Sequence, residues 1–200
     1  MGNLLAVLLP MGLVMAILGL GGWLYVRYRV KIGEKWEHNK VARSLHRFAL
    51  LCNARTLDDV KLVDNGLSGW ADHLLISSFG VVLVYDLCYS GEYSGKADAE
   101  KWLVRIRGRG TWSIPNPRIQ AAACVGRVNT LLKKAGIHLP VSYVAVLANT
   151  HRSTVSFVRS DGVVKLRQLH SYLEQETFKK EYPVDVEEVL KVLKAGQVSQ

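Results

Sequence analysis

The stretch GVVLVYDLCYSG, residues 80–91, places polar side chains where an apolar extended segment meets a turn. Asp86 offers a carboxylate there, and carboxylate oxygens are the hard ligands with which proteins hold the Mg²⁺ that assists phosphodiester hydrolysis. Tyr85 cannot replace a carboxylate, because a phenol titrates at about pH 10 and is neutral at pH 7. Leu87 carries no charge and forms no side-chain hydrogen bond. The segment therefore raises the question of whether it can hold a metal ion.

A basic stretch between residues 101 and 134 contains eight Lys or Arg residues and no Asp or Glu. Three of its arginines alternate along the chain, so they share one face on an extended edge strand, and Trp102 and Trp112 flank them. Arginine beside aromatic rings is typical of a groove that tracks phosphates and stacks bases. A solvated edge strand protected by its charges is the alternative. The predicted nucleic-acid contacts are Arg105, Arg107, Arg109 and Arg118.

Composition restricts the class of protein and of partner. The 200 residues are 49% hydrophobic and 22% charged, which suffices for one compact domain with a core and a short appendage. The net charge of +9 indicates an anionic partner, either nucleic acid or an acidic membrane surface. Three widely spaced cysteines indicate neither a disulfide framework nor a thiolate zinc site, and a reducing compartment fits best. The six histidines show no ligand spacing.

Residues 4–26 contain no charged side chain. A helix of these 23 residues, rising about 1.5 Å each, can cross about 30 Å of hydrocarbon, so we predict a transmembrane helix, with a cleaved signal peptide as the alternative. Seven Lys or Arg residues against two Glu follow between residues 27 and 47, which favours a cytoplasmic domain in a single-pass protein of the cell membrane. The predicted parts are an anchor at 1–30, an α/β domain at 33–176, and a C-terminal helix and tail at 177–200.

The remaining chain alternates helical and extended patterns. Apolar residues recur at three- and four-residue steps over 34–52, which predicts an amphipathic helix. Three extended segments joined by short turns predict an antiparallel meander at 57–63, 70–77 and 81–87. Asn116 and Pro117 are typical of a helix start and predict a helix that ends at about residue 135. The other predicted elements are an edge strand at 101–107, a buried strand at 141–148, a hairpin of 154–159 and 163–166, and helices at 169–176 and 186–193.

Several of these stretches together resemble a NERD (nuclease-related) domain, a branch of the restriction-endonuclease-like superfamily. The matching stretches are residues 33–45 in the first helix, LDDVKLV at 57–63, ADHLLIS at 71–77, GVVLVYDLCYSGEYSG at 80–95 and NPRIQ at 116–120. The resemblance implies an α/β fold, a restriction-endonuclease-like mixed-sheet sandwich in the order helix, three-stranded meander, helix, strand. Here the predicted transmembrane helix precedes it.

The resemblance also implies a metal site. In this family an Asp on the second strand and a Glu on the third hold a divalent metal, and a Lys two residues after that Glu helps to position the attacking water. A Glu of the first helix and a Gln of the second contribute as well. Carried over to this sequence, the Asp is Asp72 and the Gln is Gln120, whereas Tyr85 and Leu87 occupy the Glu and Lys positions. Asp72 as the one remaining carboxylate would hold a metal weakly.

Two further positions bear on the implied site. Spacing from the apolar residues of the first helix puts the helix Glu position on His38, so Glu37, one residue away, is a vestigial candidate. Asp86 is the candidate that would rescue metal binding, but it follows Tyr85 directly and therefore points to the opposite face of the strand unless a bulge re-aims it.

We therefore expect a membrane-anchored, nuclease-derived domain that is catalytically impaired and that binds nucleic acid or acts as a scaffold at the cytoplasmic face. No cofactor is expected, and Mg²⁺ only if the site is active. One alternative is an active Mg²⁺-dependent endonuclease with a rearranged site, built on Asp72, Asp86 and a displaced base such as Lys96 or Lys101. The other is a protein-interaction module that touches neither nucleic acid nor metal.

Overall fold

The computed structural model describes residues 2–149, 153–156, 162–175, 178 and 180–198, without the side chains of residues 2–14, 25–32 and 155–156. The chain divides into two compact units, Met1–Trp36 and Glu37–Gln200. Helix α1 (Gly2–Leu51) begins in the first unit and ends in the second. The sequence predicted two separate helices, at 4–26 and 34–52, whereas α1 runs through both without a break. An isolated glycine such as Gly33 is tolerated within a helix.

The predicted membrane segment, residues 4–26, lies within α1. Side chains are described for only part of it, residues 15–24. Among the described residues, no helix combines the length and the apolar character that a membrane crossing needs.

The second unit is built on a five-stranded sheet in the order β1-β2-β3-β7-β9. Its strands are β1 (Arg55–Asp64), β2 (Leu67–Ser77), β3 (Gly80–Leu87), β7 (Val141–Leu147) and β9 (Val163–Lys165). β1, β2 and β3 form the predicted antiparallel meander, while β7 and β9 continue the sheet in parallel with β3. The structure therefore confirms the mixed α/β class, the meander and the strand predicted at 141–148.

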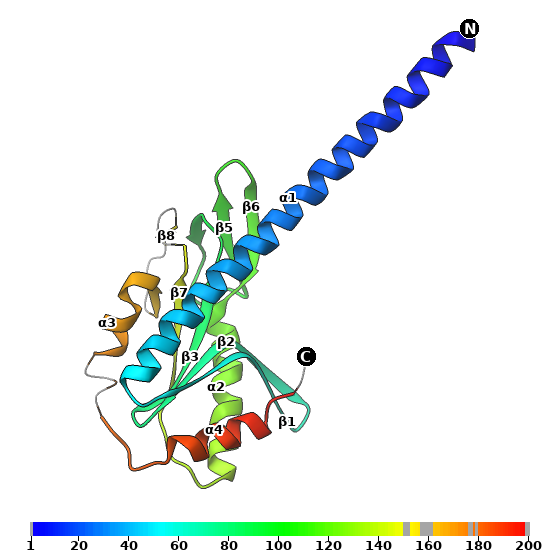
Figure 1. Cartoon of the computed structure of the whole chain (residues 1–200). Helices are drawn as coiled ribbons and strands as arrows, with labels where there is room; N and C mark the ends of the chain where they lie inside the picture. Colours follow the sequence, from blue (N-terminus) through cyan, green and yellow to red (C-terminus); the bar gives the residue numbers. More distant parts are fainter. Residues whose placement is uncertain (1, 150–152, 157–161, 176–177, 179, 199–200) are drawn as a thin grey trace. The chain divides into compact units, whose positions relative to one another are not determined.

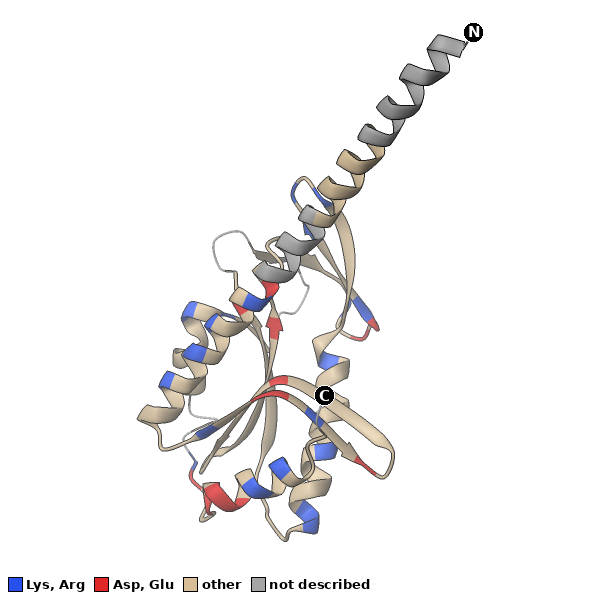
Figure 2. Ribbon diagram, turned by 45° about the vertical axis from the view of Figure 1, so that its right-hand side comes forward, with Lys and Arg blue, Asp and Glu red and all other residues tan. Residues whose placement is uncertain are grey.

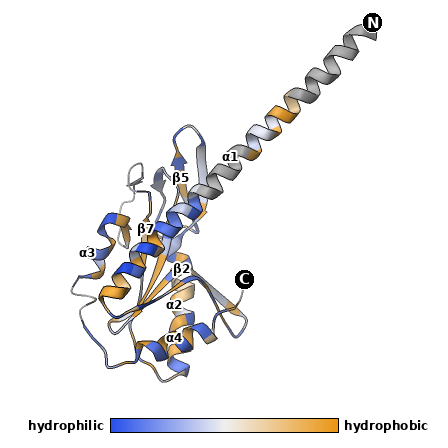
Figure 3. Cartoon of the chain, viewed as in Figure 1, coloured by the Kyte–Doolittle hydropathy of each residue, from blue (hydrophilic) through white to orange (hydrophobic). Residues whose placement is uncertain are grey.

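Helices cover both faces of this sheet (Figure 1). One face carries α2 (Pro117–Lys134) and α4 (Val186–Ala195), and the other carries the C-terminal part of α1 with η1 (Leu166–Gln168) and α3 (Leu169–Leu173). The predicted start of α2 is confirmed, since Asn116 is its N-cap and accepts the backbone N–H of Arg118. Figure 3 shows strands of the sheet coloured as hydrophobic between these helices.

Side chains of β3 alternate between two cores, one on each face of the sheet. Val81, Leu83, Tyr85 and Leu87 pack with α2 and α4, whereas Val82 and Val84 pack with α1 and α3. This period of two puts Asp86 on the α1 face, opposite its neighbours in the sequence.

A smaller sheet has the order β6-β5-β4-β8. Its strands are β4 (Glu92–Ser94), β5 (Lys101–Ile106), β6 (Gly110–Pro115) and β8 (Thr154–Ser156). The prediction of an edge strand at 101–107 is wrong, because β5 pairs with both β4 and β6. Gly108 and Gly110 adopt φ of 74° and 85°, conformations that favour glycine, and there the chain reverses into the β5–β6 hairpin.

Where they are described, the two strands of the hairpin predicted at 154–159 and 163–166 do not pair with each other. β8 pairs in parallel with β4, and β9 pairs in parallel with β7, so the two segments belong to different sheets. Residues 157–161, which include most of the predicted turn, lie outside the described residues. Pairing with strands distant in the sequence has replaced the local pairing that the turn residues favoured. The two C-terminal helices form as predicted, although α3 is shorter.

Candidate functional site

Tyr85 lies in the core between β3 and α2, with 2% of its surface exposed. Its hydroxyl donates a hydrogen bond of 2.7 Å to the backbone carbonyl of Trp70. Burial raises the pKa of Tyr85 well above its ordinary value, and the nearby Cys124 adds to this effect. A neutral hydroxyl already committed to a carbonyl is a poor ligand for a hard cation. Leu87 is also buried, in the same core.

Helix α2 closes this face of the sheet. Gly69 of β2 lies so close to α2 that a Cβ built on it would be 2.6 Å from the Cα of Cys124, so only glycine fits there. Cys124 is itself fully buried, and burial raises the pKa of its thiol to about 11. Gln120 is half-buried near the start of α2, and no hydrogen bond among the described residues joins its side chain to Asp72. Strand and helix therefore fill the space beside Tyr85.

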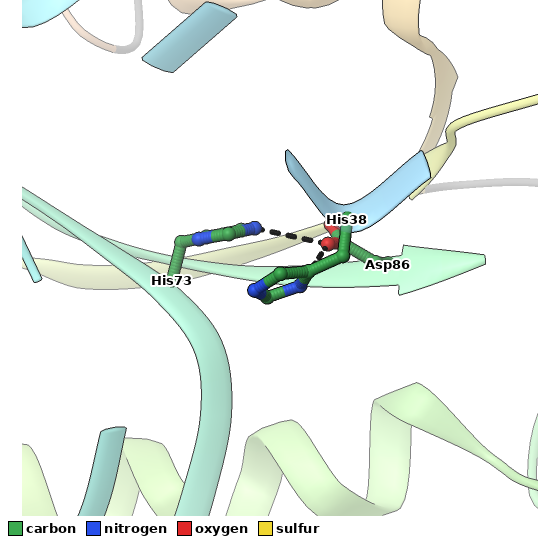
Figure 4. A group of neighbouring side chains, drawn as sticks. All are labelled: His38, His73 and Asp86. Atoms are coloured by element: carbon green, nitrogen blue, oxygen red, sulfur yellow. Dashed lines mark hydrogen bonds and ion pairs between the residues drawn. The ribbon is translucent and has the colours of Figure 1, made fainter. Parts of the chain in front are cut away.

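A polar cluster occupies the opposite face, where β2, β3 and α1 meet (Figure 4). Nδ1 of His38 and Nε2 of His73 lie 2.8 Å and 2.9 Å from the same oxygen, Oδ2 of Asp86. The two imidazole rings are stacked, with centroids 4.4 Å apart. His73 is fully buried, the Asp86 side chain is 2% exposed and the His38 side chain is 20% exposed. These three residues form the His–Asp–His cluster.

Each imidazole of the cluster also faces a second carboxylate, from β1. Nδ1 of His73 lies 2.7 Å from Oδ1 of Asp58, and Nε2 of His38 lies 3.6 Å from Oδ1 of Asp59. Asp59 has a φ of 51°, an unusual value for a residue with a side chain. The two rings are thus held between the central Asp86 and an outer pair of aspartates.

Asp72 joins the cluster because β2 separates from β3 at this point. The pairing of the two strands runs from Ser77 only as far as His73. Beyond it, Oδ2 of Asp72 accepts the backbone N–H of Asp86 at 2.7 Å, and Oδ1 of Asp72 lies 4.0 Å from Nδ1 of His38. The two carboxylates therefore come together although Asp86 remains on the face opposite Tyr85.

The charges of the cluster are coupled. Burial and, second, the neighbouring Asp86 carboxylate together raise the pKa of Asp72 to about 7. Burial alone would lower the pKa of His73, but hydrogen bonds with Asp58 and Asp86 outweigh it and raise the pKa to about 10. The hydrogen bond with Asp86 likewise raises the pKa of His38. Burial would raise the pKa of Asp58, but its hydrogen bond with His73 lowers it.

The comparison with protein families agrees with this architecture. The family model of the nuclease-related domain (NERD) matches residues 32–148, which is more than half of the chain. The chain belongs to the NERD family. This is a restriction-endonuclease-like family. Neither the curated proteins nor the solved structures gave a match.

The NERD match covers every position that the resemblance assigned to the family site, and the structure distributes these positions over both faces of the sheet. Tyr85 and Leu87 point to the α2 face, where α2 also carries Gln120. Asp86 points to the α1 face, and the carboxylate of Asp72 lies beside it. The structure therefore brings the carboxylates of Asp72 and Asp86 together, and, besides burial, the Asp72 charge also contributes to the raised pKa of Tyr85.

Glu37 does not join the cluster. It is buried, and both its carboxylate oxygens accept hydrogen bonds of 3.2 Å from Lys40, three residues further along α1. Its neighbour His38 contacts Asp86 instead. The spacing of apolar residues in the first helix put the family's helix Glu position on His38. His38 is also the residue of α1 that contacts Asp86 of β3.

The sequence predicted no role for His73, because the six histidines show no ligand spacing and adjacent residues of a strand, such as Asp72 and His73, face opposite sides. The interacting residues come from three elements, so no spacing within one segment could show them. The register of the meander carries the missing signal. His73 pairs with Val84, so it shares a face with Asp86, two residues further along β3. One of the six histidines, His151, lies outside the described residues.

Three of the four predicted nucleic-acid contacts lie on β5 or in the turn of the β5–β6 hairpin, where Figure 2 shows Lys and Arg positions in blue. Arg105 is exposed on β5, and Arg107 and Arg109 are exposed in the turn rather than on an extended edge. Arg118, half-buried at the start of α2, donates to the hydroxyl of Tyr143 at 3.0 Å.

The two tryptophans predicted to flank the arginines differ in exposure. Trp102 is 2% exposed, so its ring is not available to stack on a base. Trp112 on β6 is 36% exposed and packs edge-on against Tyr89. The hairpin therefore offers exposed charge at its tip and one partly exposed aromatic ring beside it.

Proposed function

We propose that this NERD domain is a nuclease-derived protein that has lost the family's hydrolytic site and binds nucleic acid through the β5–β6 hairpin. The observation that carries the first part is the burial of Tyr85 and Leu87 at the positions of the family's Glu and Lys. Family hydrolysis needs a second hard oxygen ligand and a cationic side chain beside the attacking water. Neither residue supplies them, because Leu87 has no polar side-chain atom and the Tyr85 hydroxyl already donates to the carbonyl of Trp70. The residues on this face do not fit the family's metal.

Binding at the hairpin is supported by charge and exposure. Arg105, Arg107 and Arg109 are exposed and close together in the chain, and the stretch that contains them has no acidic residue. One carboxylate approaches from β4, since Oε2 of Glu92 lies 3.9 Å from Arg105. Exposed ion pairs of this length are worth little, so a phosphate can replace Glu92 as the partner.

Membrane anchoring belongs to the same proposal. Its support is the uncharged segment 4–26 followed by the basic stretch up to residue 47. An anchor of this kind would present the domain at the cytoplasmic face of the cell membrane, where it can hold a nucleic acid or serve as a scaffold.

The test measures binding of single- and double-stranded DNA and RNA to the purified full-length chain over a range of salt concentrations. We expect binding without cleavage in Mg²⁺ or Mn²⁺. The variant Arg105→Gln/Arg107→Gln/Arg109→Gln should bind more weakly, and the slope of log affinity against log salt should become shallower by up to about 3, because each lost phosphate contact removes about 0.9.

The matched control removes the same charge elsewhere, with Arg43→Gln, Arg47→Gln and Arg167→Gln. These arginines line a basic pocket of about 560 Å³ between α1 and η1. The control should bind like the unmodified chain. If the control loses affinity and the hairpin variant does not, the hairpin assignment is wrong. If no nucleic acid binds at all, the proposal fails and a protein-interaction module becomes the better hypothesis.

A second candidate function is metal-dependent hydrolysis at a rearranged site. One observation favours it: Asp72 and Asp86 converge beside His38 and His73. Mg²⁺- or Mn²⁺-dependent cleavage by the full-length chain that disappears in Asp86→Asn would establish it. The same result would overturn the proposal of an impaired enzyme.

A further inference from the structure

The His–Asp–His cluster has the composition and spacing of a metal site that differs from the one the family uses. One nitrogen of His38, one nitrogen of His73 and one oxygen of Asp86 all lie within 4.8 Å of one another. Both nitrogen–oxygen distances, 2.8 Å and 2.9 Å, are close to the separation of adjacent ligands around one ion. That separation is about 3 Å when the bonds to the metal are about 2.1 Å long. A small shift of the side chains would admit an ion.

An unpartnered buried oxygen points to the same place. Oδ1 of Asp86 is buried and has no hydrogen-bond partner among the described residues. The side chain that carries it is 2% exposed, so bulk water does not compensate for the loss. A buried carboxylate oxygen without a partner is costly, and a metal ion is one of the few groups that removes this cost.

The surroundings of the histidines fit metal ligation. His ligands usually donate their other ring N–H to a carboxylate or carbonyl, which sets the tautomer and orients the ring. Asp58 stands in this position for His73, at 2.7 Å, and Asp59 faces the far nitrogen of His38 at 3.6 Å. Asp72 provides one more oxygen nearby, 4.0 Å from Nδ1 of His38.

We propose that His38, His73 and Asp86 bind a divalent transition-metal ion of the class of Zn²⁺, Co²⁺ or Mn²⁺, with Asp58 and Asp59 as positioning residues. Two imidazole nitrogens and a carboxylate suit such ions. Mg²⁺ takes oxygen ligands and keeps most of its water, so it suits this site poorly. The site lies on the α1 face, and its ligands are not those that the NERD pattern would supply.

The experiment titrates the metal alone into the full-length chain after treatment with a chelator. Isothermal calorimetry gives the stoichiometry and the affinity, and the visible absorption of bound Co²⁺ reports nitrogen and oxygen ligation. We expect one Zn²⁺ or Co²⁺ per chain and no measurable heat with Mg²⁺. The metal should also raise the thermal midpoint of unfolding, because it binds only the folded site.

Three variants separate a built site from adventitious binding. His38→Gln and Asp86→Asn should each lower the affinity at least about tenfold, since losing even an outer partner of a ligand costs about 10- to 100-fold. His138→Gln removes an exposed histidine outside the cluster and should change nothing. Because His38 is partly exposed, its variant should fold even if the more buried Asp86→Asn does not.

Two results would overturn the inference. One is the absence of saturable Zn²⁺ or Co²⁺ binding by the unmodified chain. The other is binding that His38→Gln leaves as tight as before. Neither result bears on nucleic-acid binding at the hairpin, which is tested by replacing arginines that lie outside the cluster, so the two proposals fail separately.

Discussion

Replacing Tyr85 by glutamate restores the residue type that the family uses at this position, yet we expect Tyr85→Glu to destabilise the fold rather than to build a metal site. The replaced side chain is 2% exposed and enclosed by Trp70 and Cys124. A carboxylate there is desolvated, and burial raises the pKa of a carboxyl group by up to about 3 to 5 units. A rise of about 3 units from about 4.3 corresponds to about 4 kcal/mol lost above pH 7.

The sign of this effect gives a sharp assay. A carboxyl group whose folded-state pKa is raised binds protons more tightly in the folded chain than in the unfolded chain. The free energy of unfolding that Tyr85→Glu loses through this group is therefore small below about pH 4 and grows until about pH 7. Urea unfolding of Tyr85→Glu at several pH values measures it. The control Tyr85→Phe keeps the ring and removes only the hydroxyl bonded to Trp70, which should cost about 1 to 2 kcal/mol at every pH. If Tyr85→Glu matches Tyr85→Phe at neutral pH, the buried, closed α2 face that we describe is incorrect.

Three further predictions concern the same framework. In a metal-free chain, the raised pKa of His73 stabilises the fold fully below about pH 6.5, and this contribution should disappear as the pH rises through about 10, with a slope of at most about 1.4 kcal/mol per pH unit in urea unfolding. Gly69→Ala should lower the free energy of unfolding by about 1 to 3 kcal/mol, because its Cβ would collide with Cys124, and an unchanged thermal midpoint would contradict that contact. Asn116→Ala removes the N-cap of α2 and should cost about 1 to 2 kcal/mol in chemical denaturation, with Asn129→Ala, an exposed position within the same helix, as the unaffected control.

Much of the fold could be predicted because local patterns specified it. The alternation of apolar residues and the short turns predicted the meander, and Asn116 with Pro117 predicted the start of α2. The failures share a cause. Residues 154–166 carry a turn signal, but their strands pair with strands of two different sheets. Residues 101–107 were predicted as an edge strand because the sequence pattern did not reveal β4 and β6, the strands on either side of β5. Pairing between distant segments leaves no trace in the periodicity of either one.

The candidate site shows the same division. By itself, the sequence determined that Tyr85 and Leu87 stand where the family has ionisable residues, and that Asp86 points away from them, because residue type and the period of two along a strand are local properties. Only the tertiary structure decided what Asp86 meets. The separation of β2 from β3 on the N-terminal side of His73 and the approach of His38 from α1 are matters of packing between elements. They gather carboxylates and imidazoles that lie up to 48 residues apart.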